Sequence, residues 1–269
     1  QNFDETSHGN VPLLRALGDS YNRATVRLGM EIGVDAVSGL LHELGLDHRP
    51  DPNPSLLLGA VEMSPFEVAQ VYNSLANGGF RMPLRAVRSV VDAQGEPLMR
   101  YPLELLPVAD TDAVQQVNHA MVQVLEHGTA RSAKAMLPAD LVAAGKTGTS
   151  DDFRDSWFAG FTNDHLAVVW VGDDDNHPVG LTGSAGALTI WAPVIAGLDD
   201  TRSFDPVPSS TLELVWLDYE TGLGTYEGCG RSVRVALPPG ERPPRLSGCG
   251  PGLRELGIRA KRWLEGNKQ

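Results

Sequence analysis

The chain has 269 residues, of which 42% are hydrophobic and 21% are charged, a composition typical of globular domains with an apolar core. Its 34 acidic residues outnumber its 22 basic residues, and the net charge at pH 7 is −12. This balance argues against a general nucleic-acid binder, which needs positive charge to neutralise phosphates, and against a polybasic membrane-surface module. We therefore expect no nucleic-acid partner.

No apolar run of the sequence approaches the roughly 20 residues that a membrane helix needs. The chain begins with Gln1 and Asn2, without an initiator Met, a basic segment or an apolar leader. We expect it to be a fragment or a processed product of a longer protein.

The helical spacing of apolar residues predicts three short helices between Gly9 and Leu46. Glycines or a polar break separate them. The predicted helices cover residues 12–17, 24–32 and 34–44.

A fourth helix is predicted to begin at Ser64, where a capping box is expected. Ser64 caps the helix, Pro65 takes its first position and Glu67 completes the box. The helix runs to Ala76. Downstream, the pattern predicts a β-hairpin over 86–91 and 97–101, and a helix over Thr111–Glu126 that Gly128 ends.

Three successive strands are predicted over Leu141–Thr149, Ser156–Thr162 and Leu166–Gly172. Short polar links join them, so antiparallel pairing is the simplest arrangement. A helix rich in small and apolar residues follows over Ser184–Leu198, weakened at its middle by Pro193. Helices before a strand trio, with a further covering helix, indicate a mixed α/β (α+β) architecture with an antiparallel sheet.

The composition becomes loop-rich after residue 198. Short strands are expected over Leu212–Leu217 and Val233–Leu237, and an amphipathic helix over Leu253–Leu264. We therefore divide the chain into residues 1–198 and a C-terminal extension over residues 199–269.

Cys229 and Cys249 are the only cysteines, and both lie in Gly- and Pro-rich stretches of the extension. Two thiols are too few for a tetrahedral zinc site, and no histidine lies beyond His177 to complete one. A disulfide in an oxidising compartment is the favoured interpretation, and two unpaired thiols in the cytosol are the alternative. Asp173–Asp175 with His177 could bind a metal, but a solvated loop is favoured, and no metal or cofactor is predicted.

Lys146-Thr147-Gly148-Thr149 is the strongest chemical signal in the sequence. Lys146 is one of four lysines and lies on an apolar strand, where a charged side chain suggests a functional role. Gly148 leaves room for a ligand backbone to pair with the strand edge, and the two threonine hydroxyls can bind a carboxylate. The tetrapeptide alone is also compatible with a strand that turns into a loop.

Ser20-Tyr21-Asn22 lies at the break between two predicted helices, where its side chains can point into a site. Ser and Asn are also ordinary capping and turn residues. Together with a downstream Lys-Thr-Gly strand, however, a Ser-x-Asn gives two of the three motifs of the penicillin-recognising serine acyltransferases.

Further segments resemble class A penicillin-binding proteins, in the order of that family and best in its 1b-like branch from Gram-negative bacteria. These segments are residues 2–4, 16–26, 28–29, 58–69, 76–79, 127–131, 144–149 and 155–160. The resemblance covers residues 1–198. It implies the transpeptidase fold shared with serine β-lactamases, an antiparallel sheet flanked by helices, of which this chain matches the C-terminal two-thirds.

The family's nucleophile lies in a Ser-x-x-Lys motif that this sequence lacks. The residues three positions before the four lysines are Arg131, Ala143, Ile258 and Glu265. The resemblance therefore implies that the nucleophilic Ser and its Lys lie in an upstream part, and that this chain alone is inactive.

The resemblance also implies a role for each matched residue. Ser20 relays a proton to the leaving amine, Asn22 orients the substrate amide, and Lys146 supplies positive potential for the substrate carboxylate. The implied substrate-binding residues are Tyr21, Thr147, Gly148, Thr149 and Ser150, with the Thr149 backbone N–H in the oxyanion hole. Weaker candidates for lining or shaping the site are Thr129, Asp155 and Trp157.

The implied activity is that of a D,D-transpeptidase that cross-links peptidoglycan stem peptides ending in D-Ala-D-Ala and is acylated by β-lactam antibiotics. The implied longer protein also carries a glycosyltransferase domain and a membrane anchor, and acts on the periplasmic side of the bacterial inner membrane. Its partners would include its own N-terminal part, an outer-membrane lipoprotein activator and cell-division proteins. The alternatives are a D,D-carboxypeptidase or serine β-lactamase-like hydrolase and, in another class, a non-catalytic module that binds wall peptides or a partner.

Overall fold

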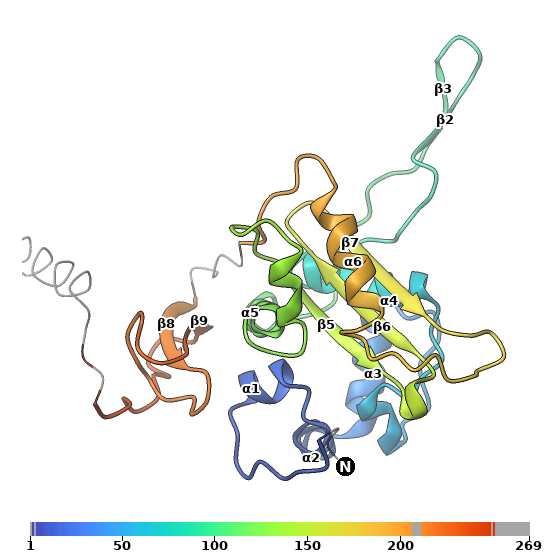
Figure 1. Cartoon of the computed structure of the whole chain (residues 1–269). Coiled ribbons are helices and arrows are strands. Elements are labelled where there is room, and N and C mark those ends of the chain that lie inside the picture. The colour runs from blue at the N-terminus through green and yellow to red at the C-terminus, as the bar shows by residue number, and fades with distance from the viewer. Residues whose placement is uncertain (1, 3, 206–210, 249, 251–269) are drawn as a thin grey trace, which may run out of the picture.

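A three-stranded antiparallel sheet forms the centre of the structure, a computed structural model that describes residues 2, 4–205, 211–248 and 250 (Figure 1). Its strands are β5 (Ala144–Thr149), β6 (Ser156–Phe161) and β7 (Leu166–Val171), in the order β5–β6–β7. The predicted trio and its antiparallel pairing are confirmed. Within the described residues, β5 is an edge strand of this sheet.

The start of β5 differs from the prediction. Leu141 and Val142 were expected to lie in the strand, which begins instead at Ala144. The Val142 N–H donates to Ser203 Oγ at 3.0 Å, and its carbonyl accepts from Phe204 N at 2.8 Å. This stretch therefore pairs with residues 203 and 204 and not with β6.

Both faces of the sheet are covered by helices. Alternate residues of a strand point to opposite faces. Phe158 of β6 packs against Trp191 of α6 (Ala187–Ala196), with ring centroids 4.8 Å apart and both residues fully buried. Phe161 belongs to a second cluster with Tyr72 of α4 (Pro65–Ala76). Helix α5 (Thr111–Glu126) lies along β5 and has the predicted bounds (Figure 1).

The N-terminal helices also follow the sequence pattern. The capping box at Ser64 is confirmed: Ser64 Oγ accepts from Glu67 N at 3.2 Å, and Glu67 Oε2 accepts from Ser64 N at 2.8 Å. The helices before it are α1 (Leu13–Gly18), α2 (Asn22–Ile32) and α3 (Val34–Leu44). Three short 3₁₀ helices lie elsewhere in the described chain: η1 (Pro54–Leu58), η2 (Arg131–Ala135) and η3 (Asp151–Phe153).

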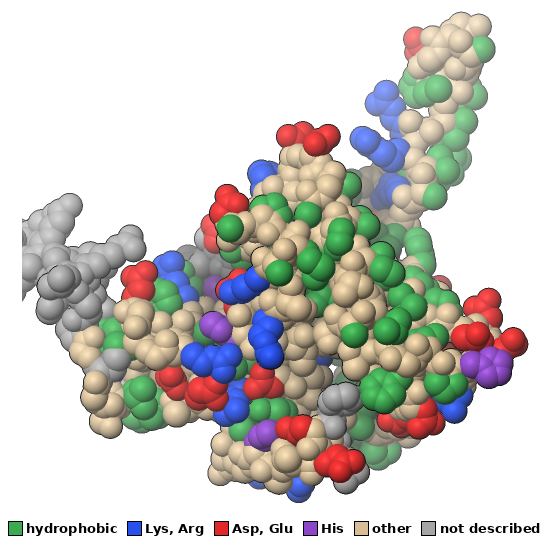
Figure 2. Space-filling model, in the orientation of Figure 1, with side chains coloured by type: hydrophobic (Ala, Val, Ile, Leu, Met, Phe, Trp, Pro, Cys, Tyr) green, Lys and Arg blue, Asp and Glu red, His purple; other side chains and the backbone are tan. Residues whose placement is uncertain are grey.

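The predicted β-hairpin is present and projects from the body of the structure (Figures 1 and 2), but its first strand begins at Ser89 and not at residue 86. It consists of β2 (Ser89–Val91) and β3 (Pro97–Arg100) and stands on a short pair formed by β1 (Phe80–Arg81) and β4 (Leu106–Pro107). Asp92 Oδ1 closes its turn by accepting from the backbone N–H of Gln94 and of Glu96, each at 2.9 Å.

The C-terminal extension contributes a separate antiparallel pair, β8 (Glu213–Asp218) and β9 (Ser232–Leu237), which confirms the two predicted strands. Its small core joins Leu217, Tyr219 and Val233 to Leu14 of α1, and β9 also packs against α5. The helix expected over 253–264 lies outside the described residues, as does Cys249 of the expected disulfide. No helix in the described part of the chain combines the length and the apolar character needed to cross a membrane.

Candidate active site

The turn that carries Ser20 is the C-terminal cap of α1. Ser20 N donates to Leu17 O at 3.2 Å and Tyr21 N donates to Ala16 O at 2.8 Å, the two bonds of a Schellman motif. Ser20 takes the left-handed position of this motif, with φ +58°, where glycine is the usual residue. Ser20 therefore has a backbone conformation that is unfavourable for residues with a side chain, and its hydroxyl is placed at the end of α1.

Lys146 joins the two sequence motifs. Its Nζ donates to Ser20 Oγ at 2.8 Å and to its neighbour's carbonyl, Thr147 O, at 2.9 Å. Burial lowers the pKa of Lys146 to about 8, because the charged ammonium loses water. A lysine and a serine that lie 126 positions apart thus form one hydrogen-bonded pair, in which the pKa of the lysine is lowered to about 8.

The threonines of β5 point to the face opposite Lys146. Thr147 Oγ1 lies 2.7 Å from Thr129 Oγ1, so the loop after α5 contacts the strand at this position. Thr149 Oγ1 accepts a bond from Gly183 N at 2.9 Å, which leaves its proton available to another acceptor.

The open edge of β5 also presents a backbone donor. Ser150 N donates to Asp155 O at 3.2 Å, toward the β6 side of the sheet. Successive N–H groups of a strand point to opposite sides, so the Thr149 N–H points to the open edge. A methyl group on Gly148 would lie 3.1 Å from Cβ of Trp157, its partner on β6, so glycine avoids a close contact between these two strands.

Three other predicted residues occupy supporting positions. Asn22 is the first residue of α2 and is half-buried. Tyr21 is 8% exposed, stacks on His8 with ring centroids 4.0 Å apart, and donates its hydroxyl to Asp19 Oδ2 at 3.1 Å. Ser150 donates its hydroxyl to the Asp155 carboxylate.

Asp155 shapes the end of the sheet. Its Oδ2 accepts from Ser150 Oγ at 2.8 Å, and its Oδ1 accepts from Trp170 Nε1 at 2.9 Å. Asp155 N in turn donates to Ser150 Oγ at 2.8 Å. Both carboxylate oxygens are therefore bonded within the fold, as expected for a shaping residue.

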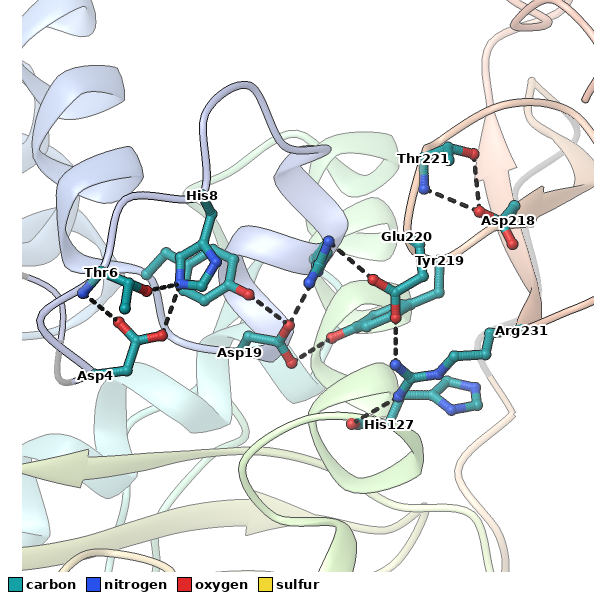
Figure 3. Close-up of polar contacts among 12 residues, drawn as sticks. Asp4, Thr6, His8, Asp19, His127, Asp218, Tyr219, Glu220, Thr221 and Arg231 are labelled. Atoms are coloured by element: carbon teal, nitrogen blue, oxygen red, sulfur yellow. Dashed lines mark hydrogen bonds and ion pairs between the residues drawn. The ribbon is translucent and has the colours of Figure 1, made fainter.

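Two residues of this region are not marked by any motif in the sequence. Asp19 holds the Ser20 turn through its carboxylate, and Tyr219 of the extension bonds to that carboxylate at 3.1 Å (Figure 3). Aspartate in a turn is common, and no sequence pattern connects two positions 200 residues apart.

The acidic loop after β7 lies on the surface. The ligand atoms of Asp173, Asp175 and His177 approach within 4.8 Å, and all three residues are exposed. Asp173 Oδ1 already accepts from Asp175 N at 2.8 Å and lies 3.1 Å from His177 Nδ1. These bonds are those of a solvated turn.

The profile of the penicillin-binding protein transpeptidase domain family matches residues 1–191. The chain belongs to this family. Among curated relatives, penicillin-binding protein 1B of Vibrio cholerae is 42% identical over 193 residues, covering 71% of this chain and 25% of the relative. Penicillin-binding protein 1B of Escherichia coli is 36% identical over 223 residues, covering 82% of this chain and 26% of the relative. The family and its 1b-like branch are thus as predicted, and the chain spans about a quarter of these relatives.

Solved structures confirm the predicted fold. Penicillin-binding protein 1A from Haemophilus influenzae superimposes with a TM-score of 0.79 at 21% identity, covering 92% of this chain and 43% of that one. The PonA1 protein from Mycobacterium tuberculosis, solved in complex with penicillin V, gives a TM-score of 0.65 at 24% identity, covering 78% and 62%. The mixed α/β arrangement of this chain is therefore that of penicillin-binding transpeptidase domains.

Proposed function

We propose that this chain is part of a peptidoglycan D,D-transpeptidase that is acylated by β-lactams and by stem peptides ending in D-Ala-D-Ala. The observation that carries the proposal is the 2.8 Å hydrogen bond from Lys146 Nζ to Ser20 Oγ, which brings the Lys-Thr-Gly and Ser-x-Asn motifs together. In a family member, this pair supplies a charge and a hydroxyl to one reacting centre.

The donor carboxylate binds at β5. The Lys146 ammonium supplies positive potential, and the hydroxyls of Thr147 and Thr149 donate to the carboxylate oxygens. The Thr149 hydroxyl suits this task, because its oxygen accepts from Gly183 N and its proton remains available. Gly148 has no side chain that could obstruct a substrate backbone pairing with the strand edge.

Ser20 carries the proton of the acylation step. The nucleophilic hydroxyl oxygen forms a bond to the carbonyl carbon of the penultimate D-Ala, and the C–N bond to the terminal D-Ala breaks. The proton lost by the nucleophile reaches the leaving amine through Ser20. The amine nitrogen of a second stem peptide then forms a bond to the same carbonyl carbon, and the ester bond to the enzyme oxygen breaks. A proton of the amine returns to that oxygen, and the cross-link is complete.

The remaining residues orient the reactants. The Thr149 N–H at the open edge donates to the developing oxyanion, together with the N–H of the nucleophile. Asn22 holds the substrate amide. Tyr21 and Ser150 support these groups from the turn and from the end of β5.

The nucleophile belongs to a Ser-x-x-Lys segment that precedes this chain in a longer protein, called here the parent protein. Residues 1–198 complete its transpeptidase domain and residues 199–269 form an extension. Membership of the transpeptidase domain family and the oxidising chemistry expected for Cys229 and Cys249 support a periplasmic location beside the inner membrane. A lipoprotein activator and cell-division proteins are the partners we propose for the parent protein.

The test compares the parent protein with this chain alone. A fluorescent penicillin should label the parent protein at the Ser-x-x-Lys serine, as mapped by mass spectrometry, and should leave the chain alone unlabelled. A stem pentapeptide with an acceptor amine should release D-Ala and form a cross-linked product. Release of D-Ala without cross-linking would assign a carboxypeptidase instead. A folded parent protein that takes no label and releases no D-Ala would refute the proposal and leave a binding module.

A further inference from the structure

The β8–β9 pair of the extension reaches the turn that carries Ser20 (Figure 3). Tyr219 follows β8 directly and is fully buried. Its hydroxyl donates to Asp19 Oδ1 at 3.1 Å, and Asp19 is the residue immediately before Ser20. A residue of the extension therefore contacts the turn of the Ser-x-Asn motif, across 200 positions of sequence.

The Asp19 carboxylate is held at both oxygens. Oδ2 accepts from the Tyr21 hydroxyl at 3.1 Å and from Arg15 Nε at 3.2 Å, while Tyr219 supplies the bond to Oδ1. Hydrogen bonds to a charged acceptor are stronger than neutral ones. Because Asp19 is also the cap residue of α1, these bonds fix the point from which the backbone continues into Ser20.

Tyr219 also packs directly against the turn. A methyl group on Gly18 would lie 2.1 Å from the Tyr219 hydroxyl oxygen. On the side of the loop after α5, Gly18 O accepts from Thr129 N at 3.0 Å. The turn is thus enclosed between the extension and that loop, and it can shift only if one of them gives way.

Tyr219 is itself held in place by charged neighbours. The Arg231 guanidinium lies 5.0 Å from its ring centroid and also donates to His127 O at 3.3 Å. Glu220 forms ion pairs with Arg231 and, at 2.8 Å, with Arg15 of α1. Burial and the negative charge of Asp19 raise the pKa of Tyr219, so its hydroxyl stays protonated and remains a donor.

We propose that Tyr219 is a positioning residue for acylation, which holds Asp19 so that the Ser20 hydroxyl stays within hydrogen-bonding distance of Lys146. This inference rests on the proposed function. Ser20 has a left-handed backbone conformation, and such a conformation persists only where the surroundings hold it. A displacement of about 1 Å in a reacting group can reduce a rate about 100-fold, so a modest loosening of the turn should be measurable.

The test replaces Tyr219 in the parent protein by phenylalanine, which keeps the ring and removes only the hydroxyl. Stopped-flow acylation by a penicillin separates the acylation rate constant from the noncovalent dissociation constant. We expect Tyr219→Phe to lower the rate constant about fivefold to tenfold, since a hydrogen bond to a charged group is lost. The dissociation constant should change less than about twofold, because the carboxylate is bound at β5.

The matched control is Tyr226→Phe, which removes a hydroxyl from the same extension. Tyr226 packs under Arg245, with 4.4 Å from the guanidinium to the ring centroid, and should leave both constants unchanged. Rates are expressed per folded molecule, so that unfolding does not count as lost acylation. A Tyr219→Phe rate constant within twofold of wild type would overturn the inference.

A double-mutant cycle with Asp19→Ala tests the route of the effect. This substitution removes the bond from Tyr219, together with those from Arg15 and Tyr21, and changes no residue of the extension. It should therefore lower the rate constant at least as much. In that background, Tyr219→Phe should cause no further loss. An equal loss in both backgrounds would show that Tyr219 acts by another route and would refute the inference. A wild-type parent protein that is not acylated would refute the proposed function instead.

Discussion

Replacing Lys146 by methionine is expected to abolish acylation and, at the same time, to stabilise the fold. Methionine keeps the unbranched stem and most of the volume of lysine but carries no charge. The lysine pKa lies at about 8, below its ordinary value of 10.5, because burial removes water from the ammonium. The buried charge therefore lowers the free energy of unfolding. Methionine at this position should remove that loss of stability and, with it, the function of the charge.

The magnitude follows from the pKa. The difference between a pKa of 10.5 and one of about 8 sets an upper limit of about 3.5 kcal/mol for the cost at pH 7. Lys146 is only half-buried, and its ammonium keeps bonds to Ser20 and to Thr147 O. Solvent screening and these bonds reduce the expected gain in the free energy of unfolding to about 1–2 kcal/mol.

The gain should depend on pH with a defined sign. Below about pH 8 the lysine is charged in both the folded and unfolded chain, so the cost is present in full. Between about 8 and 10.5 the folded chain releases its proton while the unfolded chain keeps it, and the stability of the wild type rises with pH. The advantage of Lys146→Met should therefore shrink across this window.

Urea unfolding of the parent protein, followed by tryptophan fluorescence at pH 7 and at pH 10, measures the stability, and labelling by a fluorescent penicillin measures acylation. Lys134→Met is the matched control, because Lys134 is half-exposed and pairs with Glu126 at the surface. It should change stability by less than about 1 kcal/mol and leave acylation intact. The reasoning fails if Lys146→Met lowers the stability by more than about 1 kcal/mol, or if the variant keeps more than a tenth of the acylation rate.

The wild-type acylation rate constant should fall as pH rises through about 8, because the Lys146 ammonium loses its proton there; a profile that stays flat to about pH 9.5 would contradict this. Gly128→Ala should destabilise the protein by about 1–3 kcal/mol, since its methyl group would lie 2.1 Å from Gly18 O, and an unchanged urea midpoint would contradict the close approach. Cys229 and Cys249 should form a disulfide that closes a loop of about 20 residues, worth about 3 kcal/mol. Maleimide titration of unreduced, denatured protein should find no thiol, and two thiols would exclude the bond.

Much of the fold was predictable because it is set by local rules. Helix α5 has the predicted bounds, since Gly128 follows its apolar period and Asp110 Oδ1 caps it by accepting from Ala113 N at 2.9 Å. The start of α6 differs from the prediction, which placed it at Ser184. Its predicted first residues, from Ser184, form a turn in which Gly186 N donates to Thr182 O at 2.9 Å, and the helix begins at Ala187.

The candidate site was predictable only in part. Lys146 and Ser20 each belong to a short motif of this family, so the sequence alone identifies them as candidate site residues. The left-handed conformation of Ser20 depends on where α1 ends, and a serine at that position gives no signal of it. The bond between Asp19 and Tyr219 depends on how the extension packs against α1, and packing between distant segments has no local pattern.

The contact between Asp19 and Tyr219 also sets an order for the maturation of the site. Ribosomes add about 5–20 residues per second, so Tyr219 is synthesised about 10–40 s after Asp19. During that interval the Asp19 carboxylate has only its local donors, Arg15 and Tyr21. The last of the hydrogen bonds that hold this turn can therefore form only after the chain has been made as far as Tyr219.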